Sequence, residues 1–144
     1  MSTWRFIKSW LLYTWGGLHR YFGNQNTMQS EHERAVHYFG RAYDVDPRFR
    51  TARLSRAVLL GRELGRTEEA LADYAALLAD DPQYTPALLN RGLLLQQNGS
   101  YTEALQDLQT YLQLVKWGEH RQEAERIVAL LQEILADLDE KSDD

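Results

Sequence analysis

Two histidines flank a glutamate in the segment His32-Glu33-Arg34-Ala35-Val36-His37, and such residues could bind a metal ion or transfer a proton. A zinc-protease helix has a similar pattern, but its two histidines are four residues apart, so both point at one ion. Here the spacing is five, which on a helix turns the two side chains about 140° away from each other. We therefore expect no metal here, with Glu33 capping a helix and both histidines exposed.

No other group of residues forms a recognisable reactive centre. The chain contains no cysteine, which excludes disulfides, thiolate metal sites and thiol nucleophiles. Paired carboxylates and a serine–histidine signature are missing. The pattern Gly61-x-x-x-Gly65 lacks the strand and the lysine that a phosphate loop needs. The sequence therefore predicts no enzyme, no cofactor and no metal.

Arginine is the densest source of charge in the chain. Six arginines lie within residues 48–66, namely Arg48, Arg50, Arg53, Arg56, Arg62 and Arg66. Their guanidinium groups could hold the carboxylates of an acidic partner, or they could form salt bridges with neighbouring acids on a solvated face. Residues 1–66 carry 11 basic and 5 acidic side chains, whereas residues 67–144 carry 5 and 16. The basic half suits an acidic partner or an anionic membrane, while an acidic chain without a long basic stripe is not expected to bind nucleic acid.

The elements that must position these side chains follow an internal repeat. Positions of matching size recur at a spacing of 34 residues, as in Gly65 and Gly99, Ala70 and Ala104, and Tyr74 and Leu108. A repeat of this length predicts stacked helical hairpins, each made of two antiparallel helices. Gly65 and Gly99 fall at the hairpin turns, where a left-handed backbone costs glycine least.

The repeat and its turn signals predict seven helices. Their expected bounds are Thr3 to Phe22, Ser30 to Val45, Thr51 to Leu64, Thr67 to Asp80, Thr85 to Asn98, Tyr101 to Val115, and Glu119 to Leu138. A loop over residues 23–29 should precede a capping box formed by Ser30 and Glu33. The last helix carries one apolar stripe and should cover the open end of the stack. Residues 140–144 should form a disordered acidic tail.

The repeated positions resemble the tetratricopeptide repeat family over about residues 10–138. The match rests on Asn90-Arg91-Gly92, Gly99, Tyr101, Ala104 and Leu108 in one repeat, and on Gly65, Ala70, Tyr74 and Pro82 in the repeat before it. The resemblance implies an all-α, right-handed superhelical solenoid of three helical hairpins and a C-terminal capping helix. It implies one domain over residues 1–139, with repeats at about 3–47 (including an insertion), 51–82 and 85–116, and the capping helix at 119–138. Val58, Tyr111 and Lys116 depart from the family pattern. These departures affect the expected local packing and not the expected fold.

The resemblance also implies a function, because members of this family are as a rule non-catalytic binding modules. The chain would then act as an adaptor, scaffold or complex-assembly factor that binds a peptide or helix, with some acidic character, in a concave groove. The groove positions carried over from the family are Tyr13, Arg20, Ser55, Arg56, Leu59, Arg62, Leu89, Asn90, Leu93 and Gln96. Arg56 and Arg62 would supply charge, and Asn90 would bond the peptide backbone.

One subfamily binds chaperone tails by clamping a C-terminal carboxylate with Lys, Asn and Arg at fixed groove positions. In this sequence Arg56 replaces the second-repeat Asn, and Pro86 and Asn90 replace the third-repeat Lys and Arg. The clamp is missing, so the resemblance implies no ligand of the Hsp70- or Hsp90-tail type.

The first predicted helix has more aromatic residues than an end helix of such a stack needs. One face carries Trp4, Ile7, Leu11, Trp15, Leu18 and Phe22, and a second carries Phe6, Trp10, Tyr13 and Tyr21. The surplus could be buried in a thicker core or in a homodimer contact. Alternatively, Trp4, Phe6, Trp10 and Tyr13 form a docking face for a partner or a membrane interface, as in a peripheral membrane or complex-resident subunit.

The amino-terminal segment is expected to be retained and not to span a membrane. Ten uncharged residues separate Lys8 from His19, whereas a spanning helix needs about 20. A small-x-small cleavage site does not follow. We expect a cytoplasmic protein, with membrane association as the alternative.

Overall fold

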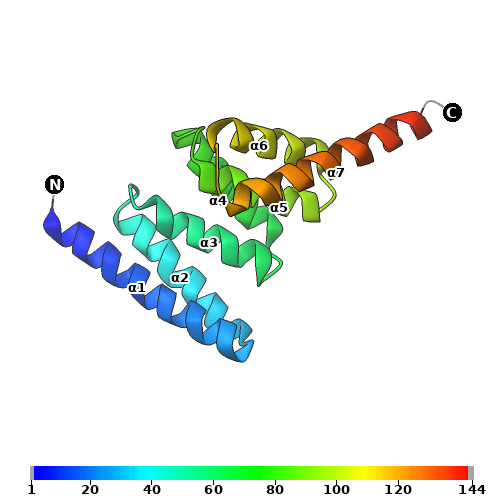
Figure 1. The fold of residues 1–144 in the computed structure, drawn as a ribbon. Coiled ribbons are helices and arrows are strands. Elements are labelled where there is room, and N and C mark those ends of the chain that lie inside the picture. Colours follow the sequence, from blue (N-terminus) through cyan, green and yellow to red (C-terminus); the bar gives the residue numbers. More distant parts are fainter. Residues whose placement is uncertain (1, 143–144) are drawn as a thin grey trace. The chain divides into compact units, whose positions relative to one another are not determined.

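The computed structural model describes residues 2–142, and within this range the regular structure consists of seven helices and no strand (Figure 1). The all-α prediction is confirmed. The helices are α1 (Thr3–Asn26), α2 (Gln29–Val45), α3 (Arg50–Arg62), α4 (Thr67–Asp80), α5 (Thr85–Gln97), α6 (Tyr101–Leu114) and α7 (Glu119–Ser142). Helices that follow one another pack together as α1 with α2, α2 with α3, α3 with α4, α5 with α6, and α6 with α7.

The helices group into two compact units, the first ending at Asp80 and the second beginning at Asp81. The first unit contains α1 to α4, and the second contains α5 to α7. Each is described by itself below. That residues 1–139 form a single domain remains a prediction.

Small residues hold α1 against α2 in the first unit, where the two helices lie side by side (Figure 1). The buried residues of α1 are Ser9, Gly16 and Gly23, spaced by two turns each. The hydroxyl of Ser9 donates a hydrogen bond to the carbonyl of Ala42 at 2.8 Å. A Cβ atom on Gly16 would lie 2.7 Å from the ring of Phe39, so only glycine permits this approach. Because α1 packs through its small side chains, its large ones are left on other faces.

The connection between α1 and α2 differs from the prediction. Helix α1 continues to Asn26, and α2 already begins at Gln29, so the predicted loop over residues 23–29 is wrong. Thr27 adopts a left-handed conformation with φ of 51°, and the amide of Met28 donates to the carbonyl of Gly23 at 3.2 Å. The left-handed Thr27 and this hydrogen bond cap the C-terminal end of α1, a role that glycine usually has. Met28, not Ser30, is the N-cap residue of α2, and the predicted capping box is absent because no side chain caps this helix.

The turns of the other two hairpins match the prediction. Gly65 and Gly99 have φ angles of 64° and 80°, which are conformations that glycine adopts at little cost. Ala70 and Ala104 are fully buried one turn into the helices that follow. The repeat therefore located both the turns and the small residues that allow close packing.

Helix α7 covers α6 in the second unit through one face. Ala124 and Leu131 are fully buried, whereas Leu138 is 51% exposed. The helix continues to Ser142, so the prediction of a disordered tail is wrong for residues 140–142, while residues 143–144 lie outside the described range. Lys141 in the last turn favours this extension, because a positive charge there complements the helix dipole.

Candidate functional site

Most of the exposed large apolar side chains in the described part of the chain lie along α1. Nine of its large apolar side chains are between 40% and 78% exposed, and we call them together the α1 apolar face: Trp4, Phe6, Ile7, Trp10, Leu11, Trp15, Leu18, Tyr21 and Phe22. At 100° per residue these positions occupy about half of the helix circumference. This half lies opposite Ser9, Gly16 and Gly23. A surface of this kind marks an interaction site.

Tyr13 does not belong to the α1 apolar face, although the sequence analysis grouped it with Trp4, Phe6 and Trp10. Its ring centroid lies 5.4 Å from that of Phe39 and 4.8 Å from that of Phe49. The side chain of Tyr13 therefore points from α1 into the first unit, where it packs against these two rings. The other three residues of that predicted docking face, Trp4, Phe6 and Trp10, are all more than half exposed.

A small apolar pocket borders the α1 apolar face. Its volume is about 320 Å³, and it is lined by Lys8, Leu11, Leu12, Trp15 and Tyr38. Lys8 is the only charged residue among them, and its side chain is exposed. The pocket therefore places the ammonium group of Lys8 beside an apolar recess formed mainly by leucine and aromatic side chains.

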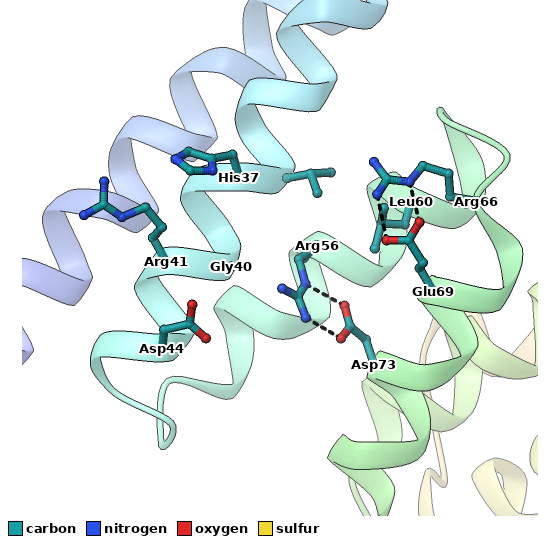
Figure 2. A pocket seen from close by; sticks show the side chains of 10 residues that line it. His37, Gly40, Arg41, Asp44, Arg56, Leu60, Arg66, Glu69 and Asp73 are labelled. Carbon is teal, nitrogen blue, oxygen red and sulfur yellow. Dashed lines mark hydrogen bonds and ion pairs between the residues drawn. The ribbon is translucent and has the colours of Figure 1, made fainter.

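A second pocket, of about 370 Å³, lies between α2, α3 and α4 (Figure 2). Arg56 reaches into it from α3 and donates to both carboxylate oxygens of Asp73, at 2.7 and 2.6 Å. Arg53 donates to the same carboxylate at 3.0 Å. The hydrogen bonds to Asp73 raise the pKa of the Arg56 guanidinium, against the opposing effect of its burial. Arg66 on the same pocket pairs with Glu69 at 2.7 Å and with Glu33 at 2.8 Å.

These pairs change the interpretation of the groove residues in the second repeat. Arg56 was predicted to contact a ligand, but its guanidinium is held by Asp73 and points between α2 and α4 (Figure 2). Leu59 is 3% exposed and packs against Ala35 and Phe39 in the core, and Ser55 is 7% exposed. Instead of the predicted ligand contact, Leu59 therefore contributes to packing. Arg62 is exposed at the end of α3.

The remaining groove residues are divided between the two units. In the first, the guanidinium of Arg20 lies 5.8 Å from the ring centre of Phe39. In the second, Leu89, Asn90, Leu93 and Gln96 are half-buried on α5. Asn90 donates its side-chain amide to the carbonyl of Pro86 at 2.7 Å, so one of its donors is used within its own helix. Whether these residues form a groove remains a prediction.

The sequence analysis missed one ion pair in the second unit. Arg91 donates to both oxygens of Asp107, at 2.6 and 2.7 Å. It joins α5 to α6 as Arg56 and Asp73 join α3 to α4. The signal was present in the sequence, because each of these two hairpins has an arginine in its first helix and a buried aspartate 16 or 17 residues later.

The two histidines that open the sequence analysis lie in different environments. His37 is exposed, as expected. His32 is 5% exposed, so the prediction that it faces solvent is wrong. Its Nε2 atom lies 2.9 Å from Oδ1 of Asn24, which satisfies the buried ring. No group of three or more His, Asp or Glu side chains that could hold a metal occurs within residues 2–142.

A third histidine, His19, forms a hydrogen bond that the sequence analysis did not predict. It donates to the Glu31 carboxylate at 2.6 Å, and its ring stacks on Tyr38 with centroids 5.4 Å apart. This bond, followed by the charge of Arg34, holds the pKa of the Glu31 carboxyl below its ordinary value of 4.5, while burial opposes the shift.

The lowered pKa of Glu31 predicts a pH dependence of stability. A carboxyl whose pKa is lower in the folded state stabilises the fold above its unfolded pKa, and this contribution disappears as the pH falls through the folded pKa. The melting temperature of Glu31→Gln should therefore lie below that of the wild type at neutral pH, and the gap should close below pH 4.5. Thermal melts across this range test this, with the exposed Glu68→Gln variant as control. A gap that persists at low pH would contradict it.

Comparisons with known proteins indicate the class of protein to which this fold belongs. Residues 63–132 match the family model described as "Tetratricopeptide repeat". The Arabidopsis OM64 TPR domain is 22% identical, with a TM-score of 0.72 over 87% of this chain and 97% of that one. A tetratricopeptide repeat protein from Parabacteroides merdae is 29% identical, with a TM-score of 0.70 over 86% of this chain and 45% of that one. No curated protein matches the sequence.

A further similar structure contains a ligand. The second TPR domain of human RPAP3, solved in complex with the HSP70 peptide SGPTIEEVD, is 22% identical, with a TM-score of 0.64 over 86% of this chain and 98% of that one. Together these matches define an all-α helical-repeat solenoid of the kind used for protein interaction. Residues 63–132 therefore belong to the tetratricopeptide repeat family, and the fold of the chain is that of TPR domains. The comparisons indicate no catalytic family, and no described helix is both long and apolar enough to cross a membrane.

Proposed function

We propose that the protein is a non-catalytic adaptor, scaffold or complex-assembly factor that binds a peptide or helix of a partner protein. Solved TPR domains with peptides, such as that of human RPAP3, support a peptide partner. The observation in this chain that carries the proposal is the half-buried row on α5, formed by Leu89, Leu93 and Gln96. These side chains occupy one face of the helix at spacings of four and three. An apolar row with a polar end suits the apolar face of a partner helix.

The ligand we propose differs from a chaperone tail. The clamp positions hold Arg56, Pro86 and Asn90; Arg56 is bound to Asp73, and Asn90 donates to Pro86. Neither is arranged to hold a free carboxylate. Arg62 is exposed on α3 and is the groove arginine of the second repeat that would interact with an acidic partner.

Affinity capture from native, detergent-solubilised lysate followed by mass spectrometry tests this proposal. Leu93→Glu should lose a partner that the wild type retains, because a carboxylate would replace apolar contact surface. Leu130→Glu is the matched control, since Leu130 is 48% exposed and belongs to α7, not to α5. If Leu93→Glu and the wild type capture the same proteins, the α5 row is not the binding surface.

The α1 apolar face favours a second candidate function, in which the protein docks through α1 as a peripheral membrane or complex-resident subunit. Its side chains remain 40% to 78% exposed, although their burial would be favourable. In the same capture experiment, Trp10→Glu tests this candidate. Loss of a partner or of membrane association in this variant alone would support docking through α1.

A further inference from the structure

We propose that the α1 apolar face docks in the interface of an anionic lipid bilayer, with α1 lying parallel to the membrane plane. The inference rests on the second candidate function above and names its partner. Four properties of α1 support it: its shape, its aromatic residue types, its charge and the pocket beside Lys8.

The geometry of α1 suits insertion at a flat interface. The helix has 24 residues and is therefore about 36 Å long. Its small residues are packed on α2, and its apolar half is directed away from them. Such a surface is convex, so it can sink into the headgroup region, whereas a protein partner would need a groove of matching length.

The residue types on this face are those of membrane interfaces. Three of the four tryptophans in the chain, Trp4, Trp10 and Trp15, lie on it and are 51% to 78% exposed. Tryptophan and tyrosine favour the headgroup level because the ring is apolar while the N–H or O–H group meets water and lipid oxygens.

The charge of α1 indicates an anionic lipid surface. Arg5, Lys8 and Arg20 are its basic residues, and the first acidic residue of the chain is Glu31. Lys8 is exposed at the edge of the α1 apolar face and lines the 320 Å³ pocket with Leu11, Trp15 and Tyr38. A lipid phosphate could pair with Lys8 while an acyl segment occupies the recess beside it.

The same charges disfavour a second copy of the chain as the occupant. A symmetric contact through the α1 apolar face would place Lys8 of both copies at the edge of one interface, and neither helix carries an acidic side chain. Arg5 and Arg20 lie on the other side of α1, where Arg5 donates to the carbonyl of Val45 and the guanidinium of Arg20 lies over Phe39. Like charges brought together in this way repel each other. An anionic bilayer supplies the opposite charge to Lys8.

Tryptophan fluorescence in a Trp117→Phe variant tests the inference. Trp117 is the tryptophan outside α1, so in this variant all tryptophan emission comes from the α1 apolar face. Vesicles with equal parts of phosphatidylserine and phosphatidylcholine should shift the emission to the blue, protect it from iodide and carry the protein upward in flotation. Pure phosphatidylcholine should bind more weakly, and Lys8→Glu should reduce partitioning on the order of tenfold or more.

Two variants provide the controls, both compared with the wild type by circular dichroism. Trp10→Glu should abolish flotation without unfolding, because Trp10 is 51% exposed, and Leu130→Glu should float as the wild type does. If anionic vesicles bind nothing while Trp10→Glu still loses a captured protein, the membrane inference is overturned and docking through α1 stands. If the wild type binds no vesicles and Trp10→Glu captures the same proteins as the wild type, the membrane inference and the proposal of docking through α1 are both wrong. A blue shift without lipid that grows with protein concentration would indicate a second copy and overturn the inference.

Discussion

Replacing Asp73 with alanine is expected to destabilise the first unit by about 2–4 kcal/mol. Asp73 is 3% exposed and accepts hydrogen bonds from Arg53 and Arg56, which lie on the neighbouring helix. Its removal leaves two guanidinium groups, whose side chains are 20% and 27% exposed, without their counter-charge. The range lies slightly below that for a fully buried pair because water still reaches both arginines. Chemical unfolding followed by circular dichroism measures the change.

Asp44→Ala is the matched control for this prediction. Asp44 lines the same pocket but is exposed, so its loss should change the free energy of unfolding by less than about 0.5 kcal/mol. A double variant, Arg56→Met with Asp73→Leu, should recover part of the loss, because apolar side chains of similar volume can replace a buried pair. Equal effects of Asp73→Ala and Asp44→Ala would show that the pair contributes no more than a surface charge.

The Arg56–Asp73 pair also shows what the sequence could and could not predict about the site. Charge pattern alone left two interpretations of the arginines open, as ligand contacts or as partners of neighbouring acids. For Arg56 the structure supports the second, since its partner lies 17 residues away on the next helix. Spacing along one helix does not reveal such a pair. The recurrence of an arginine and a buried aspartate in the second unit, as Arg91 and Asp107, was a usable signal.

The repeat predicted the helical hairpins because its spacing and its glycines are local signals. The bounds of α4 match the prediction, and Gly65 and Gly99 adopt the expected left-handed turns. The α1–α2 connection was mispredicted because Thr27 takes a left-handed conformation that is unfavourable for a β-branched residue. A left-handed conformation is uncommon at such a residue, so a single-sequence pattern gives no warning of it.

Helix α1 shows how three-dimensional packing resolves an ambiguous pattern. Its sequence has large apolar residues at two sets of helical positions, so the choice of buried face was open. The structure instead buries the set with the smallest side chains, Ser9, Gly16 and Gly23, because these let α1 approach α2 closely. The seven-residue spacing of these small residues was visible in the sequence. The exposed aromatic residues follow from this choice.

Replacing Phe39 with alanine is expected to destabilise the first unit by about 3–5 kcal/mol, the largest effect of any change proposed. Phe39 on α2 is fully buried, and its ring packs against two other helices, through Gly16 of α1 and Leu59 of α3, beside Ala35 of its own helix. The Tyr13 ring and the Arg20 guanidinium also lie beside it, at 5.4 and 5.8 Å. Because so many neighbours would have to move, the cavity cannot close. Thermal and chemical unfolding give the loss directly.

Phe6→Ala is the matched control, since Phe6 is 58% exposed on α1 and its truncation should cost less than about 0.5 kcal/mol. A comparable loss of stability from both changes would mean that Phe39 does not hold the helices together.

Leu131→Ala removes a fully buried side chain from the second unit, and the same melts then test the prediction that residues 1–139 form a single domain. If the chain unfolds as one domain, Phe39→Ala and Leu131→Ala must lower the midpoint of one shared transition. Two transitions, each moved by only one variant, would contradict it. The α1 apolar face would then depend on the first unit alone, because Phe39 is the residue that fixes α1 to α2 and α3.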